Sequence, residues 1–477
     1  MRDRHTLVIG KTGQGKTSLL AWQAFKDIES REGAVCVIDP KGGAGALAEI
    51  VGRYIPEDRL DDCLWIDMEH PIPLDFMSHK KGHRDRVVAD LTYILSKGEL
   101  DAAAVELRKN IENLLCTLLN VNEHPDLLGE PELRCTLLDV YRFFKSPDRR
   151  EYIRARITDP ELASEWTKEA FPNPTAQGRV LSRINPIVRS DTLKKIFDDP
   201  IPRLNITEHL DKKGIILASL PAIHPAAQEY GALLVAKIQH AMFSRDAYES
   251  DRIPCFLYID EFRYFRAAAD FILMLTMARS FKLCLTLADL SFDLLQSDVR
   301  TALKIIDNYI LLKAADSDIA IFQSRLAPDD DRGRIQGQIN RLYEQWVAEG
   351  SEQYSVALNR LTNLRRYLKT IPQSLTIKDA HGLMSYEAIY MLADQPPILE
   401  PTPTPAPKVP TEEQQKKLEY IKRRSREHYG PRDYAARIAQ FRPNRTTLSP
   451  TGLSPQVRHD EGDDGDKKIS PSGPATV

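Results

Sequence analysis

The chain has 477 residues, of which 42% are hydrophobic and 28% are charged, and its formal net charge is −3 at pH 7. This apolar share is enough for globular cores, and the length predicts about three domains. The slightly negative charge excludes a protein that coats nucleic acid with a basic surface along its whole length, so any DNA contact has to be a local patch or the lumen of a ring.

The first predicted element is a short buried strand over 5–9, and a glycine-rich loop follows it directly. The loop fits the pattern G-x-x-x-x-G-K-[ST] without a gap, and a helix is predicted over 17–30 from apolar residues at helical spacing. A glycine-rich turn that only resembles this motif is the alternative, but the order strand, loop, helix argues against it. The loop residues predicted to bind the nucleotide are Gly10, Lys11, Thr12, Gly13, Gln14, Gly15, Lys16, Thr17 and Ser18.

The residue types of this loop indicate its chemistry. Glycines let successive backbone N–H groups wrap around a phosphate, and the N-terminus of the following helix adds its positive dipole end. Lys16 is long enough to reach the β- and γ-phosphates, and the hydroxyl of Thr17 is predicted to ligate Mg²⁺. The loop therefore predicts a site for ATP and Mg²⁺.

Two more strands follow along the chain. The stretch GAVCVIDPKGG at 33–43 is predicted to be a strand that ends in an acid and a turn, and DDCLWID at 61–67 is predicted to be the next strand. Strands that alternate with helices indicate a parallel sheet covered on both faces. Asp39 either supports the water shell of Mg²⁺ or caps the turn at Pro40, and we favour the cap.

The sequence changes character between about 84 and 195, where it is charged and has helical spacing throughout. We interpret this stretch as an all-helical insertion; the alternative is more of the α/β core, but strand patterns are absent from it. They return at 212–221, 253–265, 282–289 and 308–315. The predicted parts are a first segment of the ATPase core over 1–82, the insertion over 83–200, and a second core segment over 201–328.

A C-terminal extension is expected after the core, with a helical and mixed part over 329–395 and a tail over 396–477. A weak strand pair is predicted around 375–392, and the proline-rich stretch 396–410 is predicted to be an extended, structureless linker. A charged helix candidate follows in the segment 411–445, where ten Lys/Arg and five Asp/Glu leave a local charge of about +5. The final residues are rich in Ser, Pro, Gly and Asp and are predicted to be disordered.

A P-loop needs a partner acid, and the stretch CFLYIDEF provides a candidate at the end of a predicted strand. Asp260 is expected to hold Mg²⁺ through water, and Glu261 is expected to orient and polarise the attacking water. This assignment makes the protein a hydrolase rather than a kinase. The alternative is a buried strand that happens to end in two acids.

Four stretches in this order, IGKTGQGKTS, VIDPKGG, YIDEF and ARSFKLCLTLAD, resemble the HerA/FtsK superfamily of ring ATPases. More closely, they resemble type IV secretion system coupling proteins of the TraD/TraG family, with its TraM-recognition/DNA-binding domain. The resemblance covers roughly 4–326. It implies an α/β fold with a RecA-like P-loop core, a mostly parallel sheet and an all-helical inserted domain. It also implies a hexameric ring that moves DNA.

The resemblance assigns one more residue. In that family an arginine placed after the acidic pair, just before the next strand, reaches into the ATP site of the neighbouring subunit, and the residue at that place is Arg279. A guanidinium inserted from outside stabilises charge on the transferred phosphoryl group. The alternative is a solvated arginine at a helix end, favoured by the helix dipole.

The sequence departs from the family pattern at the end of the next strand. Many relatives carry a glutamine there that senses the γ-phosphate, and the aligned residue is Leu290. A leucine side chain cannot hydrogen-bond a phosphate. Asp289 or Ser291 are the candidates to replace it, although the negative charge of Asp289 is unfavourable for direct contact. The hydrolysis switch of this chain is therefore expected to differ from that of its relatives.

Composition also limits the cellular context. Six cysteines are scattered without zinc spacing, so we expect small buried residues in a reducing compartment. No signal peptide is recognisable, and no apolar stretch reaches the length of about 18 residues that a transmembrane helix needs. We expect a cytoplasmic protein, or one peripheral to the inner face of a membrane. The missing N-terminal membrane helices of many coupling proteins suggest a minimal version or a fragment.

The sequence leaves two functions open. The first is a DNA-translocating ATPase of conjugation or of a mobile element, and the second is an ATPase that powers assembly of a secretion or packaging complex without moving DNA. A GTPase switch is disfavoured because the motif N-K-x-D is absent. No sequence-reading DNA motif is found, so a DNA substrate, single- or double-stranded, would be gripped by its phosphates. The basic tail is a candidate to bind DNA, a relaxase or an acidic membrane surface; the alternative is a solvated charged helix. Secretion-channel proteins are further candidate partners of the chain.

Overall fold

The computed structural model of the protein describes the residue ranges that form the sheet and the helices around it. These are 4–43, 45–77, 84–96, 102–127, 130–167, 171–245, 248, 251–265, 271–322, 326, 339, 341, 362, 380–393, 397–403, 406–407 and 409–431. All of them belong to one compact unit that extends to residue 432. The helical and mixed part expected over 329–395 falls mostly outside these residues, and the final residues predicted to be disordered fall entirely outside them.

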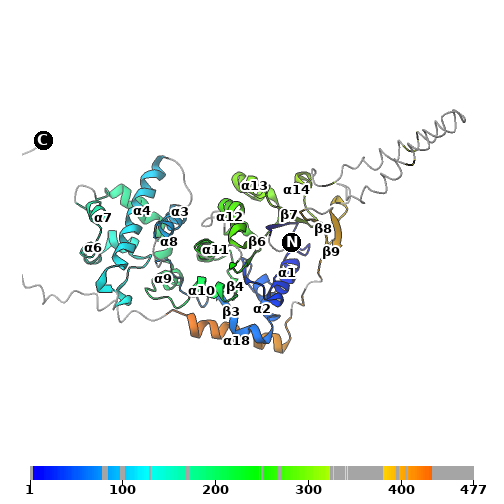
Figure 1. Cartoon of the computed structure of the whole chain (residues 1–477), viewed down its shortest axis with the longest axis horizontal. Helices are drawn as coiled ribbons and strands as arrows, with labels where there is room; N and C mark the ends of the chain where they lie inside the picture. The colour runs from blue at the N-terminus through cyan, green and yellow to red at the C-terminus, as the bar shows by residue number, and fades with distance from the viewer. Residues whose placement is uncertain are drawn as a thin grey trace, which may run out of the picture. The chain divides into compact units, whose positions relative to one another are not determined.

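The strands of the described residues form one sheet (Figure 1). They are β1 (Thr6–Ile9), β2 (Ala34–Asp39), β3 (Cys63–Asp67), β4 (Ile215–Ser219), β5 (Cys255–Ile259), β6 (Leu283–Asp289), β7 (Asn308–Leu311), β8 (Glu387–Met391) and β9 (Ile398–Pro401). The helices of the same residues are α1 (Lys16–Ser30), α2 (Leu47–Arg53), α3 (Arg84–Ser96), α4 (Ala102–Asn122), α5 (Asp139–Lys145), α6 (Pro147–Arg154), α7 (Pro160–Ser164), α8 (Pro174–Arg189), α9 (Asp191–Phe197), α10 (Ile206–Asp211), α11 (Pro225–Phe243), α12 (Phe271–Met277), α13 (Ser297–Leu303), α14 (Asp316–Ile321) and α18 (Glu412–Tyr429).

The strand order is β3-β4-β2-β5-β6-β1-β7-β8-β9. The strands from β3 to β7 in this order are parallel, whereas β8 is antiparallel to β7 and β9 is antiparallel to β8. β6 lies between β1 and β5, so the carboxyl ends of these three strands meet at one edge of the sheet. The predicted mostly parallel α/β sheet is confirmed, and this edge is where open α/β sheets bind ligands.

Both faces of the sheet are buried because the parallel strands are apolar at nearly every position. On β1, Leu7 and Ile9 belong to the core shared with α11 and α12, whereas Val8 belongs to the core shared with α1, α2 and α18. This alternation follows from the two-residue period of a strand. The sheet is thus held between two layers of helices, which fixes the position of the loop after β1.

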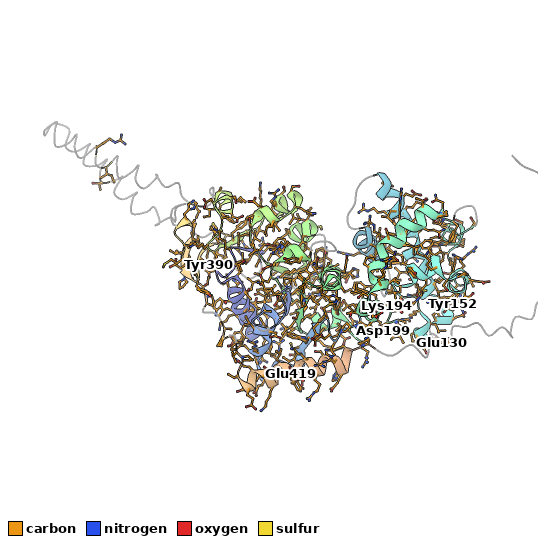
Figure 2. All side chains as sticks on the ribbon, turned by 180° about the vertical axis from the view of Figure 1, so that it is seen from behind. Glu130, Tyr152, Lys194, Asp199, Tyr390 and Glu419 are labelled. Carbon is orange, nitrogen blue, oxygen red and sulfur yellow. The ribbon has the colours of Figure 1, made fainter. Side chains whose placement is uncertain are left out.

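The described residues between β3 and β4 are helical, from α3 to α10, with short 3-10 turns. Their core is aromatic: the ring of Trp166 lies 4.7 Å from that of Phe143, and its indole N–H donates to Oγ1 of Thr117 at 2.8 Å. Figure 2 shows labelled side chains of this segment, among them Tyr152 and Lys194. The all-helical character expected for this stretch is what the structure shows.

A buried carboxylate organises the middle of this helical segment. Asp139, on α5, is fully buried and accepts hydrogen bonds from Nε of Arg149 at 2.8 Å and from its Nη2 at 3.0 Å. The backbone N–H of Thr136 donates to the same carboxylate at 2.7 Å. Burial raises the pKa of Asp139, but the Arg149 guanidinium outweighs it and holds the pKa below its usual value. The carboxylate therefore ties α5 to α6.

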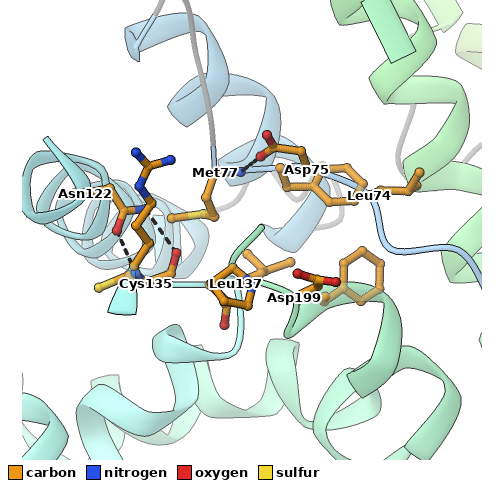
Figure 3. Close-up of a pocket in the computed structure, with 12 residues that line it drawn as sticks. Leu74, Asp75, Met77, Asn122, Cys135, Leu137 and Asp199 are labelled. Atoms are coloured by element: carbon orange, nitrogen blue, oxygen red, sulfur yellow. Dashed lines mark hydrogen bonds between the residues drawn. The ribbon is translucent and has the colours of Figure 1, made fainter. Parts of the chain in front are cut away.

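The chain leaves the sheet for the helical segment and returns from it at neighbouring places. The backbone N–H of Leu74, after β3, donates to the carbonyl oxygen of Ile196, on α9, at 3.3 Å. The outgoing and the returning segment both line a small cavity of about 30 Å³, together with Asn122 and Cys135 (Figure 3). That volume has room for a water molecule. The two connections are therefore adjacent rather than at opposite ends of the segment.

The expectations for the C-terminal region need two corrections. The weak strand pair is β8 and β9, so its second strand lies later than 375–392. The linker over 396–410 was expected to be structureless, but 398–401 form β9. The proline content does not prevent this, because β9 is the edge strand and Pro401 is its last residue. The alternating pattern of such a short strand is too weak to see beside the prolines.

The charged helix expected after the prolines is α18, and it begins with a capping box formed by Thr411 and Gln414. Its charges hide an apolar stripe: Leu418 and Ile421 are buried in the core with α2. The backbone N–H of Trp65, on β3, donates to Oγ of Ser425 at 2.8 Å. The helix is therefore docked on the sheet rather than solvated on all sides; Figure 2 marks its place by Glu419.

Among the described helices, none combines the length and the apolar character that a membrane crossing requires.

Candidate nucleotide-binding site

The glycine-rich loop connects β1 to α1 as the motif requires. Gly13 and Gly15 have φ values of 78° and 106°, a region that side chains rarely adopt, so both turns need glycine. In the described structure no side chain caps the N-terminus of α1, where Gly15 is the N-cap residue. The N–H groups of the first helical turn are therefore available to a phosphate.

Lys16 is buried, and its ammonium is held by its own loop. Nζ donates to the carbonyl oxygen of Gly10 at 2.6 Å and to that of Lys11 at 3.2 Å. Burial lowers the pKa of Lys16 below its usual value, although the carboxylates of Asp260 and Glu261 act in the opposite direction. The loop thus carries a partly desolvated positive charge, which is what attracts a phosphate group.

The structure brings the predicted magnesium ligands together. Asp260 follows β5 and is fully buried, and Oγ1 of Thr17 donates to its Oδ2 at 2.9 Å. A hydroxyl and a carboxylate are the ligands that Mg²⁺ takes from protein at a nucleotide site, with phosphates and waters completing its shell. Among the described residues there is no larger His, Cys, Asp or Glu cluster that fits a metal without a nucleotide. Thr17 and Asp260 fit Mg²⁺ that arrives with a nucleotide.

Glu261 has an unusual backbone conformation. Its φ of 43° places a non-glycine residue in the left-handed region, a costly conformation that is typical of functional sites. Its carboxylate lies close to two cations. Oε1 lies 3.3 Å from Nζ of Lys41, and Oε2 lies 2.7 Å from Nη2 of Arg263. The predicted general base is therefore held between two cations.

Lys41 is a residue of this site to which the sequence analysis assigned no role. It lies in the turn after β2, and its ammonium lies 2.9 Å from Oδ2 of Asp260 and 3.3 Å from Oγ1 of Thr17. Burial lowers its pKa, but the carboxylate of Asp260 outweighs burial and raises the pKa above its usual value. No local sequence pattern marks this role, which follows from β2 lying next to β5 in the sheet.

Asp39 has the capping role favoured from the sequence. It is fully buried, its Oδ1 accepts the backbone N–H of Lys41 at 2.9 Å, and its Oδ2 accepts that of Ala48 at 3.0 Å. Burial raises the pKa of Asp39 to about 6. The carboxylate therefore shapes the turn that presents Lys41 and connects it to the start of α2.

The end of β6, next to Leu290, carries a charged pair. The backbone N–H of Arg263 donates to Oδ2 of Asp289 at 3.2 Å, and its guanidinium is hydrogen-bonded to Oδ1. Oγ of Ser291 donates to Oδ1 of Asp318 at 2.9 Å. Asp289 and Ser291, the two candidates to replace the sensor glutamine, thus have other partners. Arg263 joins the ends of β5 and β6, and the sequence analysis did not single it out.

The strand pair β8–β9 contributes an unpredicted contact to the loop. Oγ of Ser385 donates to Oε1 of Gln14 at 3.0 Å. A Cβ added to Gly15 would lie 3.0 Å from Oγ1 of Thr402 and from a ring carbon of Tyr386, so the loop fits closely under this hairpin. The contacting residues are 371 positions apart in the chain, a separation that local patterns cannot bridge.

Arg279 lies apart from these groups. It belongs to a 3-10 turn just before β6, and its side chain is 56% exposed with Nη1 3.8 Å from Oδ2 of Asp307. The loop and the acids lie at the carboxyl ends of the strands, whereas Arg279 precedes the amino end of β6. The structure therefore does not bring Arg279 to the site of its own subunit, and its action on a neighbour stays a prediction.

Comparisons with known proteins give solved structures as the only similarity. No protein family model and no curated protein matches the sequence. The structure is similar to the plasmid coupling protein TrwB in complex with the GTP analogue GDPNP (15% identity, 84% of this chain, 86% of that chain, TM-score 0.53). The structure is also similar to TrwB in complex with ADP and Mg²⁺ (15% identity, 87% of this chain, 88% of that chain, TM-score 0.53). It is similar as well to the trigonal form of TrwB in complex with sulphate (14% identity, 86% of this chain, 88% of that chain, TM-score 0.55). The chain therefore has the RecA-like P-loop fold of a conjugative coupling protein.

Proposed function

We propose that the protein is a Mg²⁺-dependent ATPase of the type IV secretion coupling-protein kind, which uses ATP hydrolysis to move DNA. The observation that carries the proposal is the meeting of Thr17 and Asp260 at 2.9 Å beside the loop of Lys16. TrwB, which shares this fold, has been solved with ADP and Mg²⁺ and with an ATP analogue.

Each residue of the site has a distinct task in this proposal. The loop residues 10–18 and the N-terminus of α1 bind the phosphates, and Lys16 neutralises their charge. Thr17 and Asp260 would hold Mg²⁺, which would supply neutralisation of the phosphate charge. Glu261 orients a water molecule and accepts its proton. Because these groups come from the ends of β1 and β5, the sheet holds them in place.

We further propose a homo-oligomeric ring, six-membered by the resemblance, in which DNA is held by its phosphates without sequence readout. A relaxase or secretion-channel proteins are the partners proposed for such a machine. The competing function, an ATPase that powers complex assembly without moving DNA, is favoured by one observation: Leu290 stands where relatives have a sensor glutamine. DNA dependence of the hydrolysis rate separates the two functions.

The first test is ATP hydrolysis by the full chain, with and without single- or double-stranded DNA, over a dilution series. We expect DNA to raise the rate, the rate per subunit to fall on dilution, and Lys16→Ala to abolish activity, because this substitution removes the ammonium that meets the phosphates. Parallel assays with GTP determine whether the base is discriminated. Hydrolysis that is indifferent to DNA supports the assembly ATPase instead, and absence of hydrolysis contradicts both proposals.

The role of Arg279 is tested by mixing subunits. Arg279→Ala alone is expected to lose at least about a thousandfold in hydrolysis rate, the usual effect of removing an arginine finger. In a ring mixed from equal amounts of Arg279→Ala and Lys16→Ala, an Arg279→Ala subunit supplies an intact loop and a neighbouring Lys16→Ala subunit supplies an intact arginine. About a quarter of the interfaces in a randomly mixed ring are then complete, so activity should return. Failure of the mixture to recover, or an active Arg279→Ala protein, contradicts the role.

A further inference from the structure

The Lys41 ammonium occupies the place between the proposed magnesium ligands. It lies 2.9 Å from Oδ2 of Asp260 and 3.3 Å from Oγ1 of Thr17, while these two oxygens are themselves hydrogen-bonded. The third oxygen around it, Oε1 of Glu261, is also 3.3 Å away. A lysine ammonium has three donors, so this set of oxygens matches it completely.

A divalent cation and this ammonium cannot share these oxygens. Both interact with Thr17 and Asp260, Mg²⁺ with Asp260 through a water molecule, and two positive charges at such a distance repel strongly in a partly buried site. The carboxylates of Asp260 and Glu261 repel each other in the same way, so some cation has to stand between them. Lys41 is that cation in the structure, and Mg²⁺ is the one required when nucleotide binds.

The surroundings of Lys41 allow its ammonium to be exchanged for Mg²⁺. Its backbone N–H is fixed by buried Asp39, and the following Gly42 lies so close to Pro221 that an added Cβ would be 2.5 Å from its Cγ. Its side chain is nevertheless 40% exposed, in contrast to Lys16, which is 4% exposed as a residue. The backbone of Lys41 is therefore fixed, while part of its side chain is accessible to solvent.

We propose that Lys41 is a positioning residue that holds Thr17, Asp260 and Glu261 together in the metal-free site and is displaced from them by Mg²⁺. The proposal rests on the proposed function, because it assumes that Mg²⁺ and nucleotide bind here. It makes metal binding an exchange of one cation for another. As a consequence, the site stays neutralised without metal, and nucleotide binding depends less on Mg²⁺ than it would without Lys41.

The test measures binding rather than activity. The Kd of a fluorescent ATP analogue is determined with Mg²⁺ and with EDTA for the wild type, Lys41→Met, Lys41→Gln and Lys41→Arg. In Lys41→Met, Asp260 loses the ammonium that lies 2.9 Å from its Oδ2, so its carboxylate faces the triphosphate without this cation when metal is removed. We expect the ratio of Kd in EDTA to Kd in Mg²⁺ to rise at least about tenfold in the Met and Gln variants, within the usual range of coupling between two ligands. Lys41→Arg keeps the charge and should keep the wild-type ratio.

Two controls make the result specific. Lys26→Met removes one positive charge from an exposed part of α1 and should leave the ratio unchanged. Lys16→Ala serves as the blank for binding to the loop. If Lys41→Met and Lys41→Gln change both Kd values by the same factor, or neither, Lys41 is only a structural ion pair and the inference is wrong.

Failure of the inference and failure of the proposed function give different results. If the wild type binds the analogue and Lys16→Ala does not, the nucleotide site stands and the Lys41 ratio decides the inference alone. If the wild type binds no nucleotide under either condition, the proposed function is refuted, and the Lys41 inference is refuted with it. Met and Gln both remove the charge and keep most of the length of the side chain, whereas Arg keeps the charge, so an effect shared by Met and Gln but absent from Arg is an effect of charge.

Discussion

Glu261→Gln is expected to lower the rate of ATP hydrolysis by about a hundredfold to ten-thousandfold, the usual contribution of a general base, while ATP binding with Mg²⁺ persists. Glutamine keeps the length of the side chain, and its amide oxygen still accepts a hydrogen bond. It cannot take a proton from water. Single-turnover hydrolysis and binding of a fluorescent ATP analogue, measured on the same protein, separate the two effects.

A matched control for this experiment is Glu419→Gln, which changes the same residue type at an exposed position of α18. Its hydrolysis rate should equal that of the wild type. If Glu261→Gln also keeps the wild-type rate, Glu261 is not the base, and the acids to examine next are Asp260 and Asp39. Loss of nucleotide binding in Glu261→Gln would instead indicate that the ion pairs of Glu261 with Lys41 and Arg263 maintain the conformation that binds nucleotide.

Asp139→Asn is expected to lower the free energy of unfolding by about 3–5 kcal/mol at pH 7, the usual cost of breaking a buried ion pair from one side. The substitution leaves the guanidinium of Arg149 facing a neutral amide in the interior of the helical segment. Urea unfolding of the full chain, followed by tryptophan fluorescence, measures the effect because Trp166 is buried in the same segment.

The pH dependence of this effect follows from the lowered pKa of Asp139. A carboxyl whose pKa is lower in the folded state stabilises the fold fully above its unfolded value of about 4. That stabilisation is lost as the pH falls through the folded value. The gap between the wild type and Asp139→Asn should therefore shrink below pH 4. Asp148→Asn, an exposed change on α6, should show neither the loss nor the pH dependence; an equal loss in both variants would contradict the buried pair.

The parts of the site that could be predicted from the sequence are those written in contiguous patterns. The loop from Gly10 to Ser18 and the acids after β5 are each a short motif whose chemistry is local. Their meeting was also predictable, because the carboxyl ends of parallel strands share one edge of a sheet. The cap made by Asp39 follows from the turn at Pro40 beside it.

The rest depends on which strand lies next to which. Lys41 has a role because β2 is the neighbour of β5, and Arg263 has one because β6 lies beside β5 on the other side. Strand order is a property of the whole chain, and no window of sequence contains it. The hairpin contact between Ser385 and Gln14 was missed for the same reason. The helix α18 was predicted, but its docking on the sheet was not, because two buried apolar residues among many charges give only a weak apolar pattern.

The adjacency of Leu74 and Ile196 has a consequence for how such a chain can change over evolution. The helical segment leaves the sheet and returns to it at one place, so it can be treated as a cassette. If it is lengthened, shortened or exchanged, the distance between its two ends need not change. The sheet order and the nucleotide site then stay as they are while the cassette diverges. Proteins with the same sheet can in this way acquire different helical attachments.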